Sequence, residues 1–320
     1  MEIKKIRLGN QLLSSNVLMA PLAGYTCFPF RKIAYALGAG LCFTEMVSAN
    51  ALKYQDRATN RLLFHTKDDE PIKAVQLLGG VPSVMEQMAS SELLQDFDII
   101  DINMGCPVPN VFKSGEGSAL MLDMPRASAI IRGCKKSGKI VTVKCRTGIQ
   151  ENHMFAAEFA RMCEASGADM ITIHGRSRSM MYSGMPYYSE IEQAKAAVSI
   201  PVIANGGIFS AEDAEWVMQQ TGADGIMIGR YALENPFIFC ELTGWKPKWN
   251  LLELLLYEMK TTCKYYGETF AISHMQKMAS YAMKKRKGTK KYKEQLYRAG
   301  SVEELEELLH LIFCEEVPPQ

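Results

Sequence analysis

One cysteine stands where a thiol can meet a substrate. Cys106 follows the apolar run of residues 97–102 at a short distance, and Gly105 and Pro107 flank it. Glycine and proline are turn formers that end strand pairing, so we expect Cys106 in a loop at the carboxyl end of a buried strand. Most free cysteines are small core residues, and position alone leaves the reactive and the structural interpretation equally open.

A second group could act on an electron-accepting ring. Lys144 and Arg146 follow another apolar run and are two residues apart, so strand periodicity points both side chains the same way. With Gln76 and His174 they could surround a flavin, where cations stabilise the negative charge of the reduced form. Two other interpretations of Lys144 remain open. It could form an ion pair, or be a Schiff-base amine whose pKa Arg146 lowers, which would leave Cys106 without a role.

Two glycine sites predict a phosphorylated ligand. The pair Gly206-Gly207 and the pair Gly229-Arg230 each follow a short apolar run. Glycines let backbone N–H groups approach phosphate oxygens closely, and an arginine adds a bidentate cation.

The elements that must position these residues are eight short apolar runs separated by helical stretches. They are residues 17–20, 41–43, 74–75, 99–102, 140–143, 170–173, 201–204 and 225–228. Near-continuous apolar strands that alternate with amphipathic helices indicate a parallel sheet covered by helices, and eight such strands close a TIM (β/α)8 barrel. A doubly wound open sheet is the alternative. In a barrel the polar residues after each run meet at one rim, and the glycine pairs follow the seventh and eighth strands, the usual phosphate site.

The pattern changes after Gly244 from βα spacing to helical spacing. We therefore predict an α/β protein with two domains, a (β/α)8 barrel over residues 1–244 and a small all-helical domain over residues 245–320. The spacing predicts helices over 156–166, 211–220, 251–266 and 274–286. A last helix through residue 309 begins at a capping box of Ser301 and Glu304. Seven of the ten residues 284–293 are basic, which fits either a phosphate-backbone contact or a solvated face.

Composition narrows the class of protein further. The 320 residues carry a net charge of +1, so no strong overall field directs the protein to a partner. The apolar runs are too short to span a bilayer and the first residues lack a signal-peptide stretch, so we expect a cytoplasmic protein without membrane contact. Nine cysteines without a Cys-x-x-Cys pair favour free thiols over disulfides or a metal site. The oligomeric state leaves no signature in the sequence.

The motifs, taken in order, resemble those of the bacterial dihydrouridine synthases, closest to their B-type branch. The resemblance covers nearly the whole predicted barrel, and its Asn-Met-Gly-Cys-Pro element is highly specific, whereas the glycine pairs are shared by many flavin barrels. The matching segments are residues 19–24, 28–31, 44–46, 75–76, 101–107, 117–120, 144–148, 174–176, 205–208 and 229–230.

The resemblance implies an FMN-bound barrel, a helical domain that binds RNA, and NADPH-driven reduction of the C5–C6 double bond of a uridine, usually in tRNA. Hydride would pass from flavin N5 to C6, and Cys106 would be the catalytic proton donor to C5 on the opposite face. The implied FMN contacts are Pro21, Leu22, Ala23, Gln76, Lys144, His174, Asn205, Gly206, Gly207, Gly229 and Arg230. The implied contacts to uracil or RNA are Asn103, Lys113, Arg146, Arg176, Arg178, Lys284, Lys285, Arg286 and Lys287.

The sequence departs from the family in its helical domain. Where relatives often carry Met-Arg-Lys-His, this chain has Met275-Gln276-Lys277-Met278, which leaves the run from Lys284 as the expected RNA contact. Four alternatives remain open: a small-pyrimidine oxidoreductase similar to dihydroorotate dehydrogenase, uridine reduction in ribosomal RNA, a Schiff-base lyase at Lys144, and a non-catalytic RNA-binding protein. Which uridine is reduced is not encoded in a short motif, because RNA is selected by shape across a wide surface.

Overall fold

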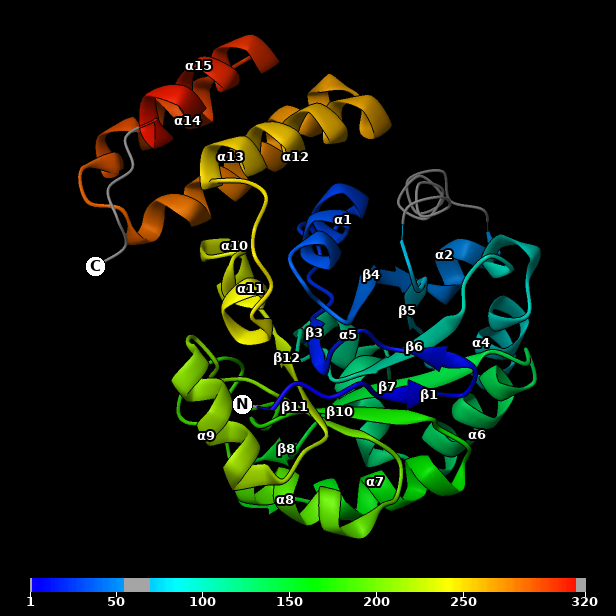
Figure 1. Cartoon of the computed structure of the whole chain (residues 1–320). Coiled ribbons are helices and arrows are strands. Elements are labelled where there is room, and N and C mark those ends of the chain that lie inside the picture. The colour runs from blue at the N-terminus through cyan, green and yellow to red at the C-terminus, as the bar shows by residue number, and fades with distance from the viewer. Residues whose placement is uncertain (1, 55–69, 315–320) are drawn as a thin grey trace.

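The computed structural model describes residues 2–54 and 70–314, and it contains the predicted closed barrel. Each barrel strand pairs in parallel with the next along the chain, and the last pairs with the first (Figure 1). The eight strands are β3 (Val17–Met19), β4 (Leu41–Ser48), β5 (Ala74–Leu78), β6 (Ile99–Met104), β7 (Ile140–Arg146), β10 (Met170–His174), β11 (Val202–Asn205) and β12 (Gly225–Ile228).

Helices cover the outside of the barrel, as the alternation of apolar runs and amphipathic stretches predicts. Two of them confirm the predicted helices over 156–166 and 211–220 to within a residue, and Ser210 caps the second by accepting the Asp213 N–H at 3.1 Å. The helices that follow the barrel strands are α1 (Phe28–Ala36), α2 (Ala49–Lys53), α4 (Pro82–Ala89), α5 (Pro109–Lys113), α6 (Met124–Lys135), α7 (Ala156–Ala165), α8 (Tyr188–Ala197), α9 (Ala211–Thr221), α10 (Tyr231–Glu234) and α11 (Ile238–Thr243), with 3-10 turns η1 (Glu92–Leu94) and η2 (Gly117–Leu122).

The barrel has two apolar cores, one on each face of its sheet. Leu18 and Phe43 belong to the cluster inside the barrel, whereas Val17 and Met19 belong to the larger cluster beneath the helices. This alternation follows from strand periodicity and explains why the strands read as continuous apolar runs. The antiparallel hairpin of β1 (Arg7–Leu8) and β2 (Gln11–Leu12) contributes Leu8 to the interior cluster.

Several strands run further than their apolar sequences indicate. Thr44 and Glu45 lie within β4, and Gln76, Asn103 and the pair at 144 and 146 lie within β5, β6 and β7. The apolar runs therefore mark only the first part of these strands, and the polar residues that follow the runs extend them. In the ladder Asn103 lies opposite Lys144, and His174 lies opposite Arg146. The side chains of Gln76, Asn103, Lys144 and Arg146 line the cavity at the barrel mouth. A short hairpin of β8 (Gly148–Gln150) and β9 (His153–Met154) follows β7.

The C-terminal region is helical. The elements are α12 (Leu251–Tyr266), α13 (Glu268–Ala282), η3 (Met283–Lys285), η4 (Thr289–Tyr292), α14 (Lys293–Arg298) and α15 (Val302–Phe313). The prediction for α12 is confirmed, but α13 begins six residues before the predicted position 274 and ends at Ala282. Ser301 caps α15 by accepting the Glu304 N–H, while the Glu304 carboxylate accepts the N–H of Gly300, so the predicted capping box is only half formed.

The C-terminal helices pack directly against the barrel at α1. The rings of Phe28 and Tyr265 meet edge to face with centroids 5.0 Å apart, and the Phe28 N–H donates to the Tyr266 hydroxyl at 3.3 Å. Lys277 of α13 donates to the carbonyl of Gly24 at 2.9 Å. Barrel and helices share one apolar cluster. Within residues 2–54 and 70–314, no helix has the length and apolar character needed to cross a membrane.

Candidate active site

The carboxyl ends of the barrel strands surround a cavity of about 300 Å³. Side chains of β4, β5, β6, β7, β10, β11 and β12 line it, and residues 20–23 after β3 complete the ring. The prediction that the strand tips meet at one rim is confirmed. Active sites of TIM barrels are built at this face.

A hydrogen-bonded chain crosses one side of the cavity. Buried Asp101 accepts hydrogen bonds from Thr142 at 2.6 Å and from the amide of Gln76 at 2.7 Å. Gln76 in turn accepts from Asn103 at 2.9 Å, and Asn103 accepts the backbone N–H of Cys106 at 2.9 Å. Burial raises the pKa of Asp101 to about 6, although Thr142 and Gln76 stabilise its charged form. Asp101 therefore holds the amide of Gln76, Gln76 holds that of Asn103, and Asn103 holds the turn that carries the cysteine.

The Cys106 side chain lines the cavity and is 9% exposed. The carbonyl of Cys106 accepts a hydrogen bond from the hydroxyl of Ser118 at 2.8 Å. A Cβ on residue 117 would lie 2.9 Å from the Cβ of Cys106, so only glycine fits at position 117. Burial raises the pKa of the thiol above its ordinary value, so Cys106 is protonated at neutral pH. A protonated thiol is suited to donate a proton and unsuited to attack as a nucleophile.

Four cationic side chains line the cavity: Lys144, Arg146, Arg176 and Arg230. The described lining contains no Asp or Glu. Like charges gathered without counter-charges are costly, and an anionic ligand relieves that cost. The cavity is therefore electrostatically prepared for an anion.

Two titratable groups on neighbouring strands respond to this field. Lys144 donates to Asn205 Oδ1 at 3.0 Å, and burial first and Arg146 second lower its pKa to about 8. Burial, followed by Lys144 and Arg146, keeps the pKa of His174 well below its ordinary value, so the imidazole is neutral. Its Nε2 lies 3.4 Å from a guanidinium nitrogen of Arg176. A lowered lysine pKa also suits a Schiff-base amine, so electrostatics alone leave that alternative standing.

The predicted phosphate end of the cavity is formed by backbone. Gly206 and Gly207 have φ of 106° and 76°, and a Cβ on Gly206 would lie 2.6 Å from the ring of His174. Glycine is thus required by both conformation and space. Gly229 lines the same cavity, and a Cβ there would meet no atom within 4 Å. That open space beside a backbone N–H is what a phosphate needs.

Most of the residues singled out from the sequence meet in this one cavity. Those in its lining are Pro21, Leu22, Ala23, Gln76, Asn103, Cys106, Lys144, Arg146, His174, Arg176, Asn205, Gly206, Gly207, Gly229 and Arg230.

The others lie elsewhere. Lys113 is exposed on α5, and the guanidinium of Arg178 stacks on the ring of Phe112 at 3.7 Å. Lys284 pairs with Glu234 of α10 at 2.9 Å. Arg286 lies over the ring of Phe313, Lys287 is exposed, and the side chain of Lys285 lies outside the described residues.

Tyr182 and Met46 also line the cavity, and sequence reasoning missed both. The guanidinium of Arg230 lies 4.2 Å from the centre of the Tyr182 ring, and that of Arg146 lies 5.5 Å from it. Tyr182 belongs to an irregular segment after β10, where no periodic pattern marks a side chain as functional. Met46 lies in β4 and reads as an ordinary core residue.

Fold and site together define a (β/α)8-barrel protein with a cationic ligand cavity at the carboxyl ends of its strands. A family model described as dihydrouridine synthase (Dus) matches residues 18–317, and the chain belongs to this family of enzymes. The tRNA-dihydrouridine synthase B of Pseudomonas aeruginosa is 33% identical over 303 residues, which is 92% of this chain and 91% of that protein. The Pasteurella multocida protein of the same name is 40% identical over 235 residues, 73% of this chain and 70% of that protein.

Solved structures confirm the fold at low sequence identity. A morphinone reductase mutant in complex with tetrahydroNAD has a TM-score of 0.55 and 14% identity, covering 76% of this chain and 90% of that chain. A 2-naphthoyl-CoA reductase complex has a TM-score of 0.59 and 11% identity, covering 76% and 52%. The TIM barrel predicted from the eight apolar runs is therefore shared with enzymes of widely different sequence.

Proposed function

We propose that this protein binds FMN and uses NADPH to reduce a uridine of tRNA to 5,6-dihydrouridine. The observation that carries the proposal is one cavity that combines four cations, a glycine-built phosphate end and the protonated thiol of Cys106, with no carboxylate among the lining residues that the structure describes. Membership in the dihydrouridine synthase family and relatives named tRNA-dihydrouridine synthase B support the choice of reaction and of tRNA.

The residues present fit FMN. Gly229 leaves open space beside Arg230 for a phosphate, and the apolar residues 21–23 line the cavity where a ring would lie. Gln76 and Lys144, both held by neighbouring side chains, would face the polar edge of that ring. The negative charge that a bound flavin gains on reduction would further stabilise the ammonium form of Lys144, which burial disfavours.

The chemistry divides between the cofactor and the chain. When bound, a flavin reduced by NADPH would supply the hydride for C6 of the uracil. The Cys106 thiol supplies the proton to C5, and Asn103 holds the backbone of Cys106 in place for that transfer. Arg146 is fixed by three carbonyls, those of Gly105, Ser177 and Met181, which leaves a rigid cation to orient the uracil oxygens.

The direct test uses the purified full chain. We expect a yellow protein that releases FMN on denaturation and that, given NADPH and unmodified tRNA, adds two hydrogen atoms to one uridine, detected by mass spectrometry of the digested RNA. A colourless protein that does not take up FMN contradicts the proposal. Dihydrouridine in ribosomal RNA and not in tRNA corrects the substrate, and turnover of a free pyrimidine alone favours the small-molecule alternative.

Replacing Gly229 with valine is expected to weaken FMN binding without unfolding the protein. A Cβ at this position meets no protein atom within 4 Å, and Gly229 is not among the residues of positive φ, so its backbone tolerates a side chain. The valine side chain would fill the space for the phosphate and remove hydrogen bonds to a charged group worth about 1.5–3 kcal/mol, which raises Kd roughly 10- to 100-fold. Titration of the apoprotein with FMN, followed by flavin fluorescence, measures the change.

Gly229→Ala is the matched control, because one methyl group blocks less of the same space. Its Kd should lie between those of wild type and Gly229→Val, and the melting temperature of both apoproteins should equal that of wild type. Unchanged FMN affinity in Gly229→Val would place the phosphate elsewhere.

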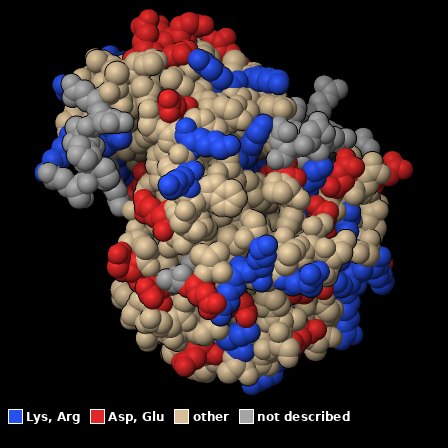
Figure 2. All heavy atoms as spheres, in the orientation of Figure 1, with Lys and Arg blue, Asp and Glu red and all other residues tan. Residues whose placement is uncertain are grey.

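The charges on the surface of the C-terminal helices indicate which part of that surface tRNA would contact. Figure 2 shows acidic side chains gathered at the top of the molecule, where Figure 1 places α15. That helix exposes Glu303, Glu304 and Glu307, and such a face repels phosphates. The basic segment 284–293 follows α13 and ends at the first residue of α14, with Lys290, Lys291 and Lys293 exposed. Gln276, at the position where relatives often have arginine, instead holds the carbonyls of Tyr297 and Ala299.

The double variant Lys290→Ala with Lys293→Ala is expected to weaken tRNA binding uniformly across tRNA sequences. For each phosphate contact that the variant removes, the slope of log K against log salt concentration becomes shallower by about 0.7–0.9. Binding measured at several salt concentrations gives the slope. Lys260→Ala is the control, because Lys260 pairs with Glu306 of the acidic helix α15 and its removal should leave the slope unchanged. Equal slopes for the double variant and wild type would exclude this segment from the tRNA contact.

Deleting residues 245–320 is a poorer test of RNA dependence. The deletion would expose the apolar cluster that α1 shares with α12 and remove the Lys277 contact to Gly24. Loss of activity would then report unfolding as readily as loss of RNA binding, whereas replacing exposed lysines changes only charge.

A further inference from the structure

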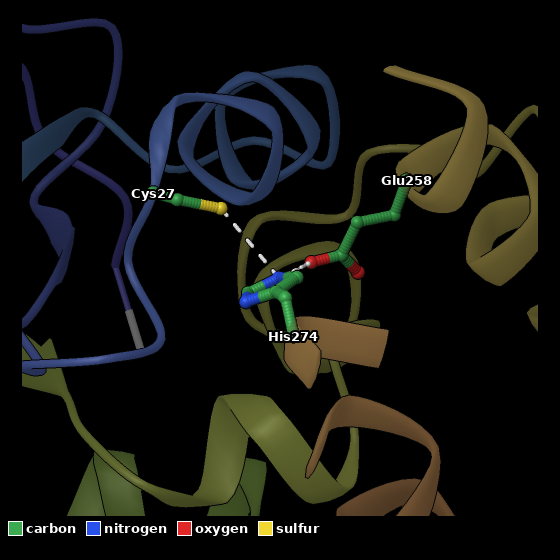
Figure 3. A group of neighbouring side chains, drawn as sticks. All are labelled: Cys27, Glu258 and His274. Atoms are coloured by element: carbon green, nitrogen blue, oxygen red, sulfur yellow. Dashed lines mark hydrogen bonds and ion pairs between the residues drawn. The ribbon is translucent and has the colours of Figure 1, made fainter. Parts of the chain in front are cut away.

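Three buried side chains from distant parts of the chain converge where the barrel meets the C-terminal helices. Cys27 precedes α1, Glu258 lies on α12, and His274 lies on α13. Figure 3 shows the thiol and the carboxylate both directed at the imidazole. The Cys27 Sγ lies 3.5 Å and a Glu258 oxygen 2.7 Å from His274 Nε2, and one ligand atom from each residue lies within 4.8 Å of the others. All three residues are at most 2% exposed.

Hydrogen bonding alone does not satisfy this cluster. His274 Nε2 faces both Cys27 and Glu258, but one ring nitrogen either donates one hydrogen or accepts with one lone pair. Other polar atoms here have no hydrogen-bond partner among the described residues: the second Glu258 oxygen, His274 Nδ1 and the Thr262 hydroxyl one turn along α12. Buried polar groups left unpaired cost free energy, so a missing partner is indicated.

The spacing of the three atoms is close to that of ligands around one metal ion. With a Zn–S bond of about 2.3 Å and a Zn–N bond of about 2.0 Å, tetrahedral geometry separates sulfur and nitrogen by about 3.5 Å. That is the separation of Cys27 Sγ from His274 Nε2. Nitrogen and oxygen ligands would be about 3.3 Å apart, so the Glu258 carboxylate has to retreat by only about 0.6 Å.

The ligand chemistry selects the kind of ion. Thiolate, imidazole and carboxylate together suit zinc, whereas calcium and magnesium prefer oxygen ligands alone. A divalent ion with one thiolate, one carboxylate and a neutral imidazole carries no net charge, which suits a buried position. The unpartnered Glu258 oxygen is available as a further ligand.

We propose that Cys27, Glu258 and His274 bind a zinc ion that fixes the C-terminal helices to the barrel. Cys27 directly follows the segment 21–26, whose first residues line the candidate active site. The ion therefore ties that segment to α12 and α13, beside the contact of Lys277 with Gly24. The nine cysteines gave no sign of this site, because its ligands are 231 and 16 residues apart in sequence and form no short motif.

Cobalt is the probe, because its tetrahedral thiolate complexes absorb red light where oxidised flavin does not. The full chain is produced in cells grown with cobalt in place of zinc, so that metal is present while the buried site forms. We expect one cobalt ion per chain by elemental analysis and the red absorption bands of a tetrahedral thiolate site. Both signals should be lost in Cys27→Ser and weakened in Glu258→Gln.

Cys263→Ser is the matched control, since Cys263 lies on α12 outside the cluster and the variant should keep the full signal. Wild-type protein from cells grown with zinc should have a higher melting temperature than wild-type protein from cells grown without zinc. Cys27→Ser should show no such difference. Wild type that holds no more cobalt than Cys27→Ser overturns the proposal, and this comparison does not depend on flavin or tRNA.

Discussion

Replacing Cys106 with alanine is expected to lower the rate of dihydrouridine formation by about 10²–10⁴-fold, the usual contribution of a positioned general acid. The thiol lines the cavity, and its backbone is held by Asn103 and Ser118, so alanine removes the proton donor without moving the loop. FMN content and the oxidation of NADPH in the absence of tRNA should stay at wild-type levels. Single-turnover formation of dihydrouridine in a tRNA transcript measures the effect.

The pH dependence follows from the state of the thiol. A general acid works while protonated, and burial raises the pKa of Cys106 above its ordinary value. The rate should therefore hold through neutral pH and fall only on the alkaline side, as the thiol loses its proton. In Cys106→Ser the part of this alkaline limb that the thiol causes should disappear, because a serine hydroxyl does not ionise in that range. The part caused by deprotonation of Lys144, whose pKa is about 8, should remain.

Cys145→Ala is the matched control for Cys106→Ala. Cys145 lies on the neighbouring strand, pairs in register with Met104 and is buried, but it does not line the cavity. Its variant should keep wild-type turnover. Wild-type turnover in Cys106→Ala would remove the thiol from the mechanism, and loss of FMN from that variant would show that the cysteine shapes the flavin site instead.

The barrel could be predicted from sequence because the burial of each strand determines the residue types within that strand. Each strand is buried on both faces, so Ile99 and Ile100 are both apolar even though one belongs to the interior cluster and the other to the outer cluster. The strand ends could not be predicted as well. Lys144 is charged, yet it stays in the ladder opposite Asn103 and Thr172, because the barrel mouth accepts a polar side chain while the backbone still pairs.

The same contrast holds for the helices. The start of α9 has a clear signal, since Ser210 offers an oxygen to the Asp213 N–H. The start of α13 lacks such a signal, because Gly267 precedes it at φ 84° and has no side chain to cap the helix. The prediction therefore placed the start of α13 at His274, six residues late.

The candidate site was predicted where it depends on strand tips and missed where it depends on tertiary approach. Cys106, Lys144 and Gly206 each follow or end an apolar run, so topology alone brings them together. Tyr182 reaches the cavity from an irregular segment, and Glu258 meets Cys27 only through the packing of α12 on α1. Such contacts are fixed by the shape of the folded chain, and no spacing in the sequence records them.

The second large effect concerns stability and arises at a buried ion pair beside β4. Arg31 of α1 donates to both oxygens of Glu70, at 2.6 and 3.1 Å, and also to the carbonyl of Thr26 at 2.8 Å. Both side chains are 2% exposed. Desolvation offsets much of the attraction in such a pair, but removing one partner leaves the other charge buried alone.

Glu70→Ala is therefore expected to lower the free energy of unfolding by about 3–5 kcal/mol, measured by urea denaturation of the purified protein. The double variant Arg31→Met with Glu70→Leu should recover most of that loss, because it removes both charges and keeps the volume filled. The free energy of unfolding of Glu70→Gln should lie between those of wild type and Glu70→Ala, since its amide oxygen still accepts one hydrogen bond from Arg31. A change below about 0.5 kcal/mol in Glu70→Ala, the size of an ordinary surface substitution, would mean that the guanidinium reaches water when its partner is removed.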